Sequence, residues 1–174
     1  MGQVNINRLT NGNVYVDGVS WFGSFEEVTL PDIKAIMSEH KGLGMIGKLE
    51  FVAGIDKLEM KIKWNSVYQP AMKASADFYT PHQLTVRASL EQYDATAGRV
   101  AQLPVVVNIR GQFKKLPGLG LKQQDNVEAE SELTCTAYQM IINGEEVVDL
   151  DLIAQVYRVD GVDLMATYRS NLGI

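Results

Sequence analysis

The segment Lys57–Trp64, which reads KLEMKIKW, alternates charged and apolar side chains without interruption. A period of two is the pattern of a β-strand with one face in water and the other against a core. We therefore predict a half-buried strand whose outer face is charged. The charged side chains of this predicted strand are Lys57, Glu59, Lys61 and Lys63.

The preceding segment, Lys48–Ala53, shows the same alternation, with Lys48 and Glu50 on the charged side. Gly54-Ile55-Asp56 is predicted to join the two strands as a hairpin turn. A sheet of this kind presents a continuous charged surface. It favours a wall or an interface over a small enclosed pocket.

Length and composition predict a single soluble domain over residues 1–174, because 46% apolar and 21% charged residues suffice for a core. The formal charge of −5 argues against binding nucleic acid by neutralising phosphates. A single cysteine, Cys135, excludes an intrachain disulfide and favours a reducing compartment. No apolar run of about 18 residues is present, so stable membrane insertion is not expected.

The remaining pattern predicts further antiparallel strands and two helices. The expected hairpins are Asn13–Val16 with Val19–Phe22 across Asp17-Gly18, extended by Phe25–Leu30; Leu84–Glu91 with Leu103–Phe113 across Asp94–Gly98; and Val127–Ile142 with Glu145–Arg158 across Asn143-Gly144. The expected helices are Ser66–Tyr79, with Ser66 as N-cap, and Val162–Asn171, ended by Gly173. The predicted class is mainly β: an antiparallel β-sandwich or half-barrel with one flanking helix and a short C-terminal helix.

The segment Pro31–Gly47 is unusually apolar for a loop. Loops that stay in water are normally polar, so we predict that this segment is ordered by docking on a neighbouring subunit. The alternative is that its apolar side chains cap the core of their own subunit. The residues concerned are Ile33, Ile36, Met37, Leu43, Met45 and Ile46.

No catalytic, cofactor or metal site is predicted. Gly42–Gly47 has the spacing GxGxxG, but strand-like residues follow it, whereas a dinucleotide fingerprint opens a helix. His40 and His82 stand apart from other ligand residues and are interpreted as loop or surface histidines. Cys135 is predicted to be a small buried side chain in a strand. Alternation makes Glu128, Glu130 and Glu132 a solvated stripe rather than acid–base catalysts.

Several short motifs, in their order and spacing, resemble one known family. They are Asn13–Gly18, Val28–Pro31, Gly42–Met45, Arg110-Gly111, Asn143–Glu146, Gly161–Asp163 and Arg169–Ile174. The chain is similar to the major tail tube proteins of contractile-tailed phages, a family that also supplies the tube of R-type bacteriocins.

The resemblance implies a subunit without catalytic activity that forms hexameric rings, which stack into a hollow tube and join their strands into one large β-barrel. It also implies a sheath, a baseplate and a tape measure protein as partners, location in the virion tail after assembly in the host bacterial cytoplasm, and DNA that passes through the lumen without specific binding. We then expect Lys48, Glu50, Lys57, Glu59, Lys61 and Lys63 to face the lumen. A solvated outer face remains the alternative for these residues.

Two other functions remain open at this point. The first is the tube of a genome-free bacteriocin or injection particle, which the sequence does not distinguish from a phage tail. The second is a β-barrel that binds a small molecule, which also shows alternating strands but would be a monomer with a central cavity.

Overall fold

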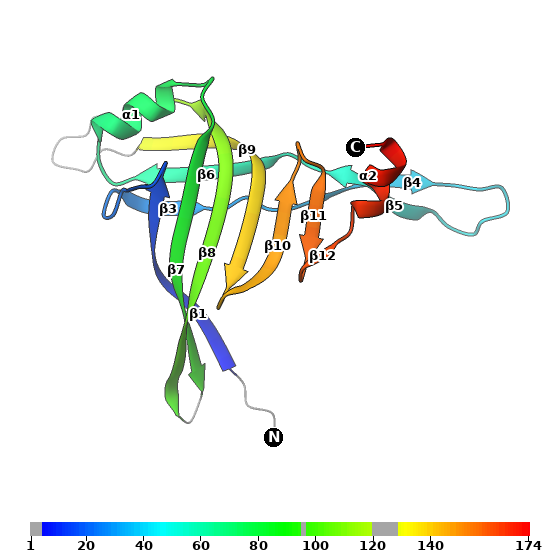
Figure 1. Ribbon diagram of the computed structural model, residues 1–174, viewed down its shortest axis with the longest axis horizontal. Helices are drawn as coiled ribbons and strands as arrows, with labels where there is room; N and C mark the ends of the chain where they lie inside the picture. The colour runs from blue at the N-terminus through cyan, green and yellow to red at the C-terminus, as the bar shows by residue number, and fades with distance from the viewer. Residues whose placement is uncertain (1–4, 95–96, 120–128) are drawn as a thin grey trace.

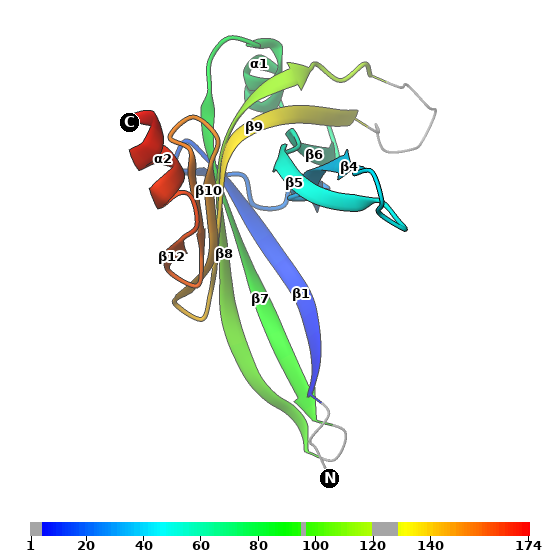
Figure 2. The same cartoon turned by 90° about the vertical axis from the view of Figure 1, so that its right-hand side faces the viewer.

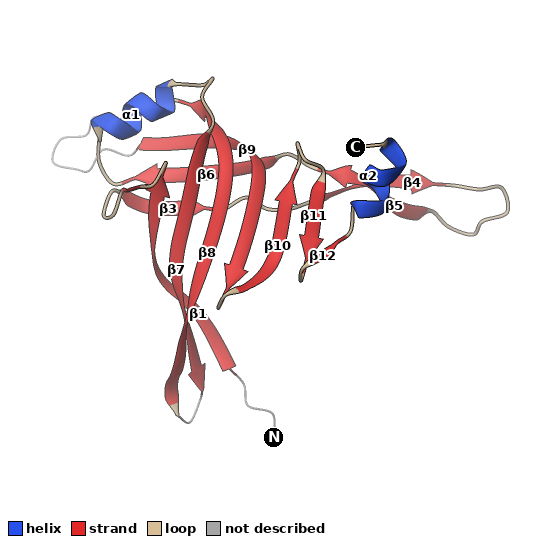
Figure 3. Cartoon of the chain, in the orientation of Figure 1, coloured by secondary structure: helices blue, strands red, loops and turns tan. Residues whose placement is uncertain are grey.

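The computed structural model describes residues 5–94, 97–119 and 129–174 of the chain. The elements are β1 (Asn5–Val16), β2 (Val19–Ser20), β3 (Phe25–Thr29), β4 (Ala35–His40), β5 (Leu49–Ile55), β6 (Leu58–Trp64), α1 (Gln69–Ala76), β7 (His82–Asp94), β8 (Gly98–Lys115), β9 (Ala129–Ile142), β10 (Glu145–Asp151), β11 (Val156–Val159), β12 (Val162–Asp163) and α2 (Ala166–Leu172). The fold is mainly β and its strands pair antiparallel, as predicted (Figure 3).

The main sheet bends into two layers, and strand β9 runs through both of them (Figures 1 and 2). Its first part, up to Cys135, pairs with β6, and β6 pairs in turn with β3. Its second part pairs with β10 and with the middle of β8. We call layer A the strands β3, β6, the first part of β9 and the end of β8 from Gly111. Layer B is the row β12-β11-β10-β9-β8-β7-β1-β2.

Gly111 lies where β8 passes from one layer into the other, beside a register shift after Arg110. A Cβ atom at this position would lie 2.8 Å from the backbone oxygen of Thr134. Only glycine lets the two strands approach this closely without a shift of the backbone. This contact explains why the motif Arg110-Gly111 contains a glycine.

The core lies between the two layers. The alternation predicted for β6 is confirmed, since its apolar side chains Leu58, Met60, Ile62 and Trp64 are all 0% exposed. Layer B contributes residues such as Val14, Leu84 and Ile109. Helix α1 packs at one end, where Ser75 and Ser131 join hydroxyl groups at 2.9 Å and Trp64 Nε1 donates to Ser131 Oγ. The three residues thereby satisfy one another's polar atoms inside the core.

The predicted helix Ser66–Tyr79 is shorter in the structure. It begins after Tyr68, not Ser66, and has no side-chain N-cap. It ends before Asp77, whose carboxylate instead accepts hydrogen bonds from the backbone amides of Tyr79 and Thr80. The C-terminal helix begins later than predicted, at Ala166, and ends as predicted at Gly173, which has a φ of 72°.

The predicted hairpin between Lys48–Ala53 and Lys57–Trp64 is wrong. Strand β5 pairs with β4 and runs on into β6 in the same direction, so that β3–β4 and β5–β6 form one long ribbon (Figure 1). Thr29↔Lys61 and Ala35↔Ile55 belong to one continuous register. Pro31, which has no amide hydrogen, falls in the gap between β3 and β4. The turn of this ribbon is the segment 41–48.

The outer half of the ribbon, β4–β5, projects beyond both layers, and we call it the arm (Figures 1 and 2). The segment Pro31–Gly47 is therefore not a loop, because it contains strand β4. Gly42–Gly47 lies at the tip of the arm and leads into strand β5, not into a helix.

Two predicted turns are confirmed by positive φ angles: Asp17-Gly18 at 50° and 81°, and Asn143-Gly144 at 52° and 84°. The β7–β8 hairpin is also confirmed. Phe25–Leu30 does not extend the first hairpin, because β3 pairs with β6, and Glu145–Arg158 is two strands, β10 and β11. The predicted start of β9 at Val127 and the side chain of Glu128 lie outside the described residues.

Candidate assembly surfaces

The outer face of layer A carries part of the predicted charged set. Glu59, Lys61 and Lys63 alternate with the buried residues of β6 and point away from the core, and Lys57 precedes them. Lys48 and Glu50 do not join this face, because the arm holds them beyond the sheet, where Lys48 pairs with Glu39 at 2.7 Å. The structure therefore divides the six predicted residues between two surfaces.

Ion pairs link strands across this face. Glu59 pairs with Lys114 and with Lys57 (2.9 Å). Lys114 also pairs with Glu132 (3.4 Å). Further pairs join Lys115 with Glu130 (3.4 Å) and Glu132 (3.2 Å), and Lys63 with Glu26 (3.0 Å).

The pairing changes the acidity of these groups. Hydrogen bonds from Lys114 and then Lys57 lower the pKa of Glu59 to about 2. Lys115, followed by Lys114, lowers the pKa of Glu132. Hydrogen bonds to Glu59 and Glu132 raise the pKa of Lys114 and Lys115 respectively. All four groups are therefore charged at neutral pH.

The sequence did not predict that Lys114 and Lys115 lie on this face. Strict alternation would send two adjacent residues to opposite sides of a sheet, but a register shift between Phe113 and Lys115 brings both onto the outer face. Glu130 and Glu132 do lie on one outward stripe, as predicted, although they pair with lysines rather than with water alone.

The arm exposes apolar side chains at its tip and along both strands. Leu43 and Ile46 are fully exposed, and Ile36, Met37 and Met45 are 41 to 48% exposed. Among the residues predicted to dock, Ile33 differs, because it is half-buried and packs against the core. A lone two-stranded hairpin is marginally stable in water, so the arm gains from contact with another surface.

Layer A has an open backbone edge on each side. Among the described residues, strand β3 has β6 as its one partner strand. At the other side, β7 pairs with β8 only as far as Gly111, so the segment 112–115 has no second strand beside it in the described part of the chain. Open edges of this kind are templates for pairing with another chain.

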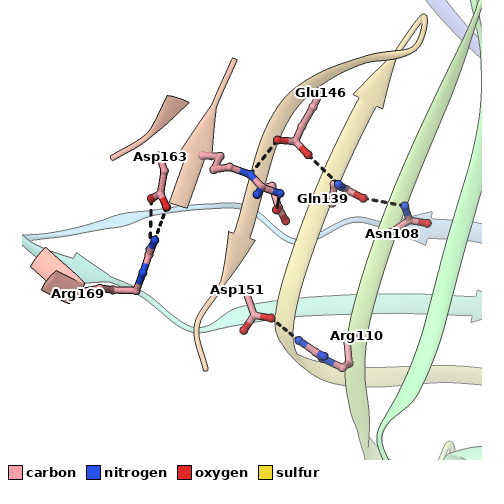
Figure 4. A network of polar contacts seen from close by, with 9 residues as sticks. Asn108, Arg110, Gln139, Glu146, Asp151, Asp163 and Arg169 are labelled. Atoms are coloured by element: carbon pink, nitrogen blue, oxygen red, sulfur yellow. Dashed lines mark hydrogen bonds and ion pairs between the residues drawn. The ribbon is translucent and has the colours of Figure 1, made fainter. Parts of the chain in front are cut away.

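A second polar network crosses the outer face of layer B (Figure 4). Asn108 donates to Gln139, Gln139 donates to Glu146, and Glu146 accepts from Arg158. Separate ion pairs join Arg110 with Asp151 and Arg169 with Asp163. The outward positions of β8, β9 and β10 could be assigned from alternation, but their partners depend on a strand order that the sequence did not establish.

The two histidines and the cysteine lie in strands. His82 was interpreted as a loop or surface residue, and this was wrong: it begins β7, its side chain is 12% exposed, and it lies 2.7 Å from Asp17 and edge-on to Phe113. His40 is exposed on the arm, not in a loop. Cys135 is buried as predicted, and burial raises the pKa of its thiol to about 12.

The described residues lack two kinds of feature. They contain no group of three or more His, Cys, Asp or Glu side chains arranged to hold a metal ion. No helix in the described ranges has the length and apolar character needed to cross a membrane.

A bent antiparallel sheet with two open edges, a charged outer face and a projecting arm defines a structural protein that assembles with other chains. The profile of the family described as Phage tail tube protein FII matches residues 6–173, so the chain belongs to this family of tail tube proteins. The role of the family is structural: its members build the tail tube.

Known proteins agree with this membership. The chain is 29% identical over 173 residues to the tail tube protein of Escherichia phage P2, covering 96% of this chain and 97% of the relative. Two cryo-EM structures of an extracellular contractile injection system, PVC, share the fold. One is a sheath/tube terminator (TM-score 0.56, 13% identity, 75% of this chain and 92% of that chain), and the other a sheath–tube complex (TM-score 0.55, 14% identity, 75% and 87%).

Proposed function

We propose that six copies of this chain close into a ring through the two open edges of layer A, and that rings stack into the hollow tube of a contractile phage tail. The single observation that carries this proposal is the pair of open edges on opposite sides of one layer. A contact between two different edges is heterologous, and repeating such a contact closes a ring when the rotation allows it.

In this arrangement layer A is the wall of the lumen. Each copy contributes four strands, β3, β6, β9 and β8, to a barrel of many strands, and wide barrels enclose an aqueous channel. Glu59, Lys61 and Lys63, with Lys57, then face the lumen. Their mixed charges let a DNA genome pass without specific binding.

The arm supplies the second contact. Its length and its exposed apolar residues suit docking on a neighbouring copy in the same ring or in the next one. Lys48 and Glu50 then belong to this docking contact or to the lumen beside it. Helix α1 and the C-terminal segment remain on the outside, where a sheath protein would surround the tube, with a baseplate and a tape measure protein at its ends. Assembly in the host bacterial cytoplasm and location in the virion tail complete the proposal.

Chemical cross-linking tests the edge contact. Thr29 ends β3, and Leu116 follows the last residue of β8; both are exposed. The double variant Thr29→Cys/Leu116→Cys, treated with a short bis-maleimide under assembly conditions, should give a ladder of covalent oligomers that ends at the hexamer. Cys135 is buried and contributes little background.

The single-cysteine variants are the matched controls. Each carries one reactive edge, so each should give no ladder. A double variant that yields monomers only, although electron microscopy shows normal tubes, would rule out the pairing of β3 with the end of β8.

A further inference from the structure

We infer that Glu59, Glu130 and Glu132 mask a latent phosphate-binding cluster of lysines on the outer face of layer A and so keep nucleic acid from adhering to it. The biological setting rests on the proposed function, in which this face lines the lumen. The physical claim concerns a single subunit and is testable without any tube.

The lysines of this face lie on two strands, one on each side of β9. They come from β6 and the residue before it, and from the end of β8, with β9 between these two strands. The lysines are Lys57, Lys61, Lys63, Lys114 and Lys115. Several ammonium groups on one open sheet face are suited to contacts with phosphates.

Carboxylates occupy the positions between these ammonium groups. Glu59 lies between Lys57 and Lys114, and Glu132 lies between Lys114 and Lys115. Glu130 gives Lys115 a second partner at 3.4 Å. A phosphate approaching Lys114 or Lys115 must therefore displace a carboxylate that the lysine already holds.

Stability alone does not account for this arrangement. The paired side chains are 24 to 45% exposed around Lys114 and Lys115, and exposed ion pairs contribute little to stability. The charge balance of the face indicates that the glutamates offset the lysines. With Glu26 and with Glu27, which lies opposite Lys63 in the register of β3 and β6, five glutamates leave a net charge of 5 − 5 = 0 among the described residues of this face, and two Glu→Gln substitutions raise it to +2.

The test measures DNA binding by the isolated subunit, kept dilute so that it does not assemble. Fluorescence anisotropy of a labelled duplex at about 50 mM salt should show little or no binding by the wild-type chain. The variant E59Q/E132Q should bind at least about tenfold more tightly, and the gain should disappear at about 300 mM salt, because it comes from counterion release.

Two further variants separate the lysine cluster from net charge. E145Q/D160N removes two carboxylates from exposed turn-proximal positions of layer B and changes the total charge by the same amount, so it should leave DNA binding at the wild-type level. Adding K114Q and K115Q to E59Q/E132Q should abolish the gain, because the unmasked ammonium groups are then missing.

Circular dichroism checks that each variant is folded, and E59Q/E130Q replaces E59Q/E132Q if the latter is not. The inference is overturned if E59Q/E132Q gains no affinity, if E145Q/D160N gains as much, or if wild type already binds as tightly as the variant. Failure of the cross-linking test leaves these binding results intact, so the two proposals fail separately.

Discussion

The pKa of Glu59 is lowered by the lysines around it on the outer face of layer A. Its carboxylate accepts hydrogen bonds from Lys114 of β8 and from Lys57, the residue before β6, and the pKa falls from 4.5 to about 2. A carboxyl group whose pKa is lower in the folded chain than in the unfolded chain stabilises the fold above its unfolded pKa. This contribution is lost as the pH falls through the folded pKa.

We therefore predict that Glu59→Gln makes the chain less stable than wild type at pH 6, and that this difference shrinks between pH 4.5 and about 2 as Glu59 becomes protonated. Urea midpoints measured at pH 6, 4 and 3 follow the difference. It should be small, since exposed pairs contribute little.

Glu145→Gln is the matched control, since Glu145 forms no ion pair within the described ranges of the chain. Its difference from wild type should not follow the titration of Glu59. A Glu59→Gln difference that stays constant over the whole pH range would contradict the prediction.

At the scale of elements, the sequence predicts the features that depend on neighbouring residues, such as strand alternation and tight turns. The alternation of β6 is confirmed because side-chain direction in a strand depends on adjacent residues alone. The turns at Asp17-Gly18 and Asn143-Gly144 are confirmed because these dipeptides supply two positive φ angles.

Pairing between distant segments was not predictable in the same way. Gly54 looked like a turn, yet it is not among the residues with positive φ, whereas Gly44 at the tip of the arm has a φ of 87°. Two glycine-containing segments, Gly54-Ile55-Asp56 and Gly42–Gly47, could each form the turn of a hairpin. The alternation on both sides of Gly54 is compatible with a turn there and with a continuous strand. The positions of Lys114 and Lys115 on the outer face of layer A were not predicted either. A β-bulge between Phe113 and Lys115 interrupts the alternation of inward and outward side chains on which the prediction depends.

The arm gives the prediction that belongs to this scale. The double substitution Leu43→Asp/Ile46→Asp places charges on two side chains that contact little in the isolated subunit. The subunit should therefore keep its unfolding midpoint, while tubes seen by electron microscopy become short or absent, because burying two unpaired carboxylates in a docking contact is unfavourable.

Lys41→Ala is the control for a change at the same tip that leaves the apolar side chains in place, and it should form tubes of normal length. Tubes of normal length from the Leu43→Asp/Ile46→Asp chain would show that the arm tip does not take part in docking.

For the whole molecule, the distribution of charge matters more than its total. The chain carries −5, but the charges on the outer face of layer A balance among the described residues, so the acidic excess lies on the other surfaces. Copies that approach one another through edges and arms therefore repel over a distance of about one Debye length, which shortens from about 20 Å near 25 mM salt to about 6 Å near 300 mM.

We predict from this repulsion that moderate salt promotes assembly. The concentration of subunit at which tubes appear in light scattering should fall between about 25 and about 300 mM salt. The variant E145Q/D160N, with a formal charge of −3, should assemble at a lower subunit concentration than wild type in low salt and depend less on added salt. The opposite trend, with salt raising the subunit concentration needed, would mean that attractive ion pairs between copies outweigh the repulsion of their net charges.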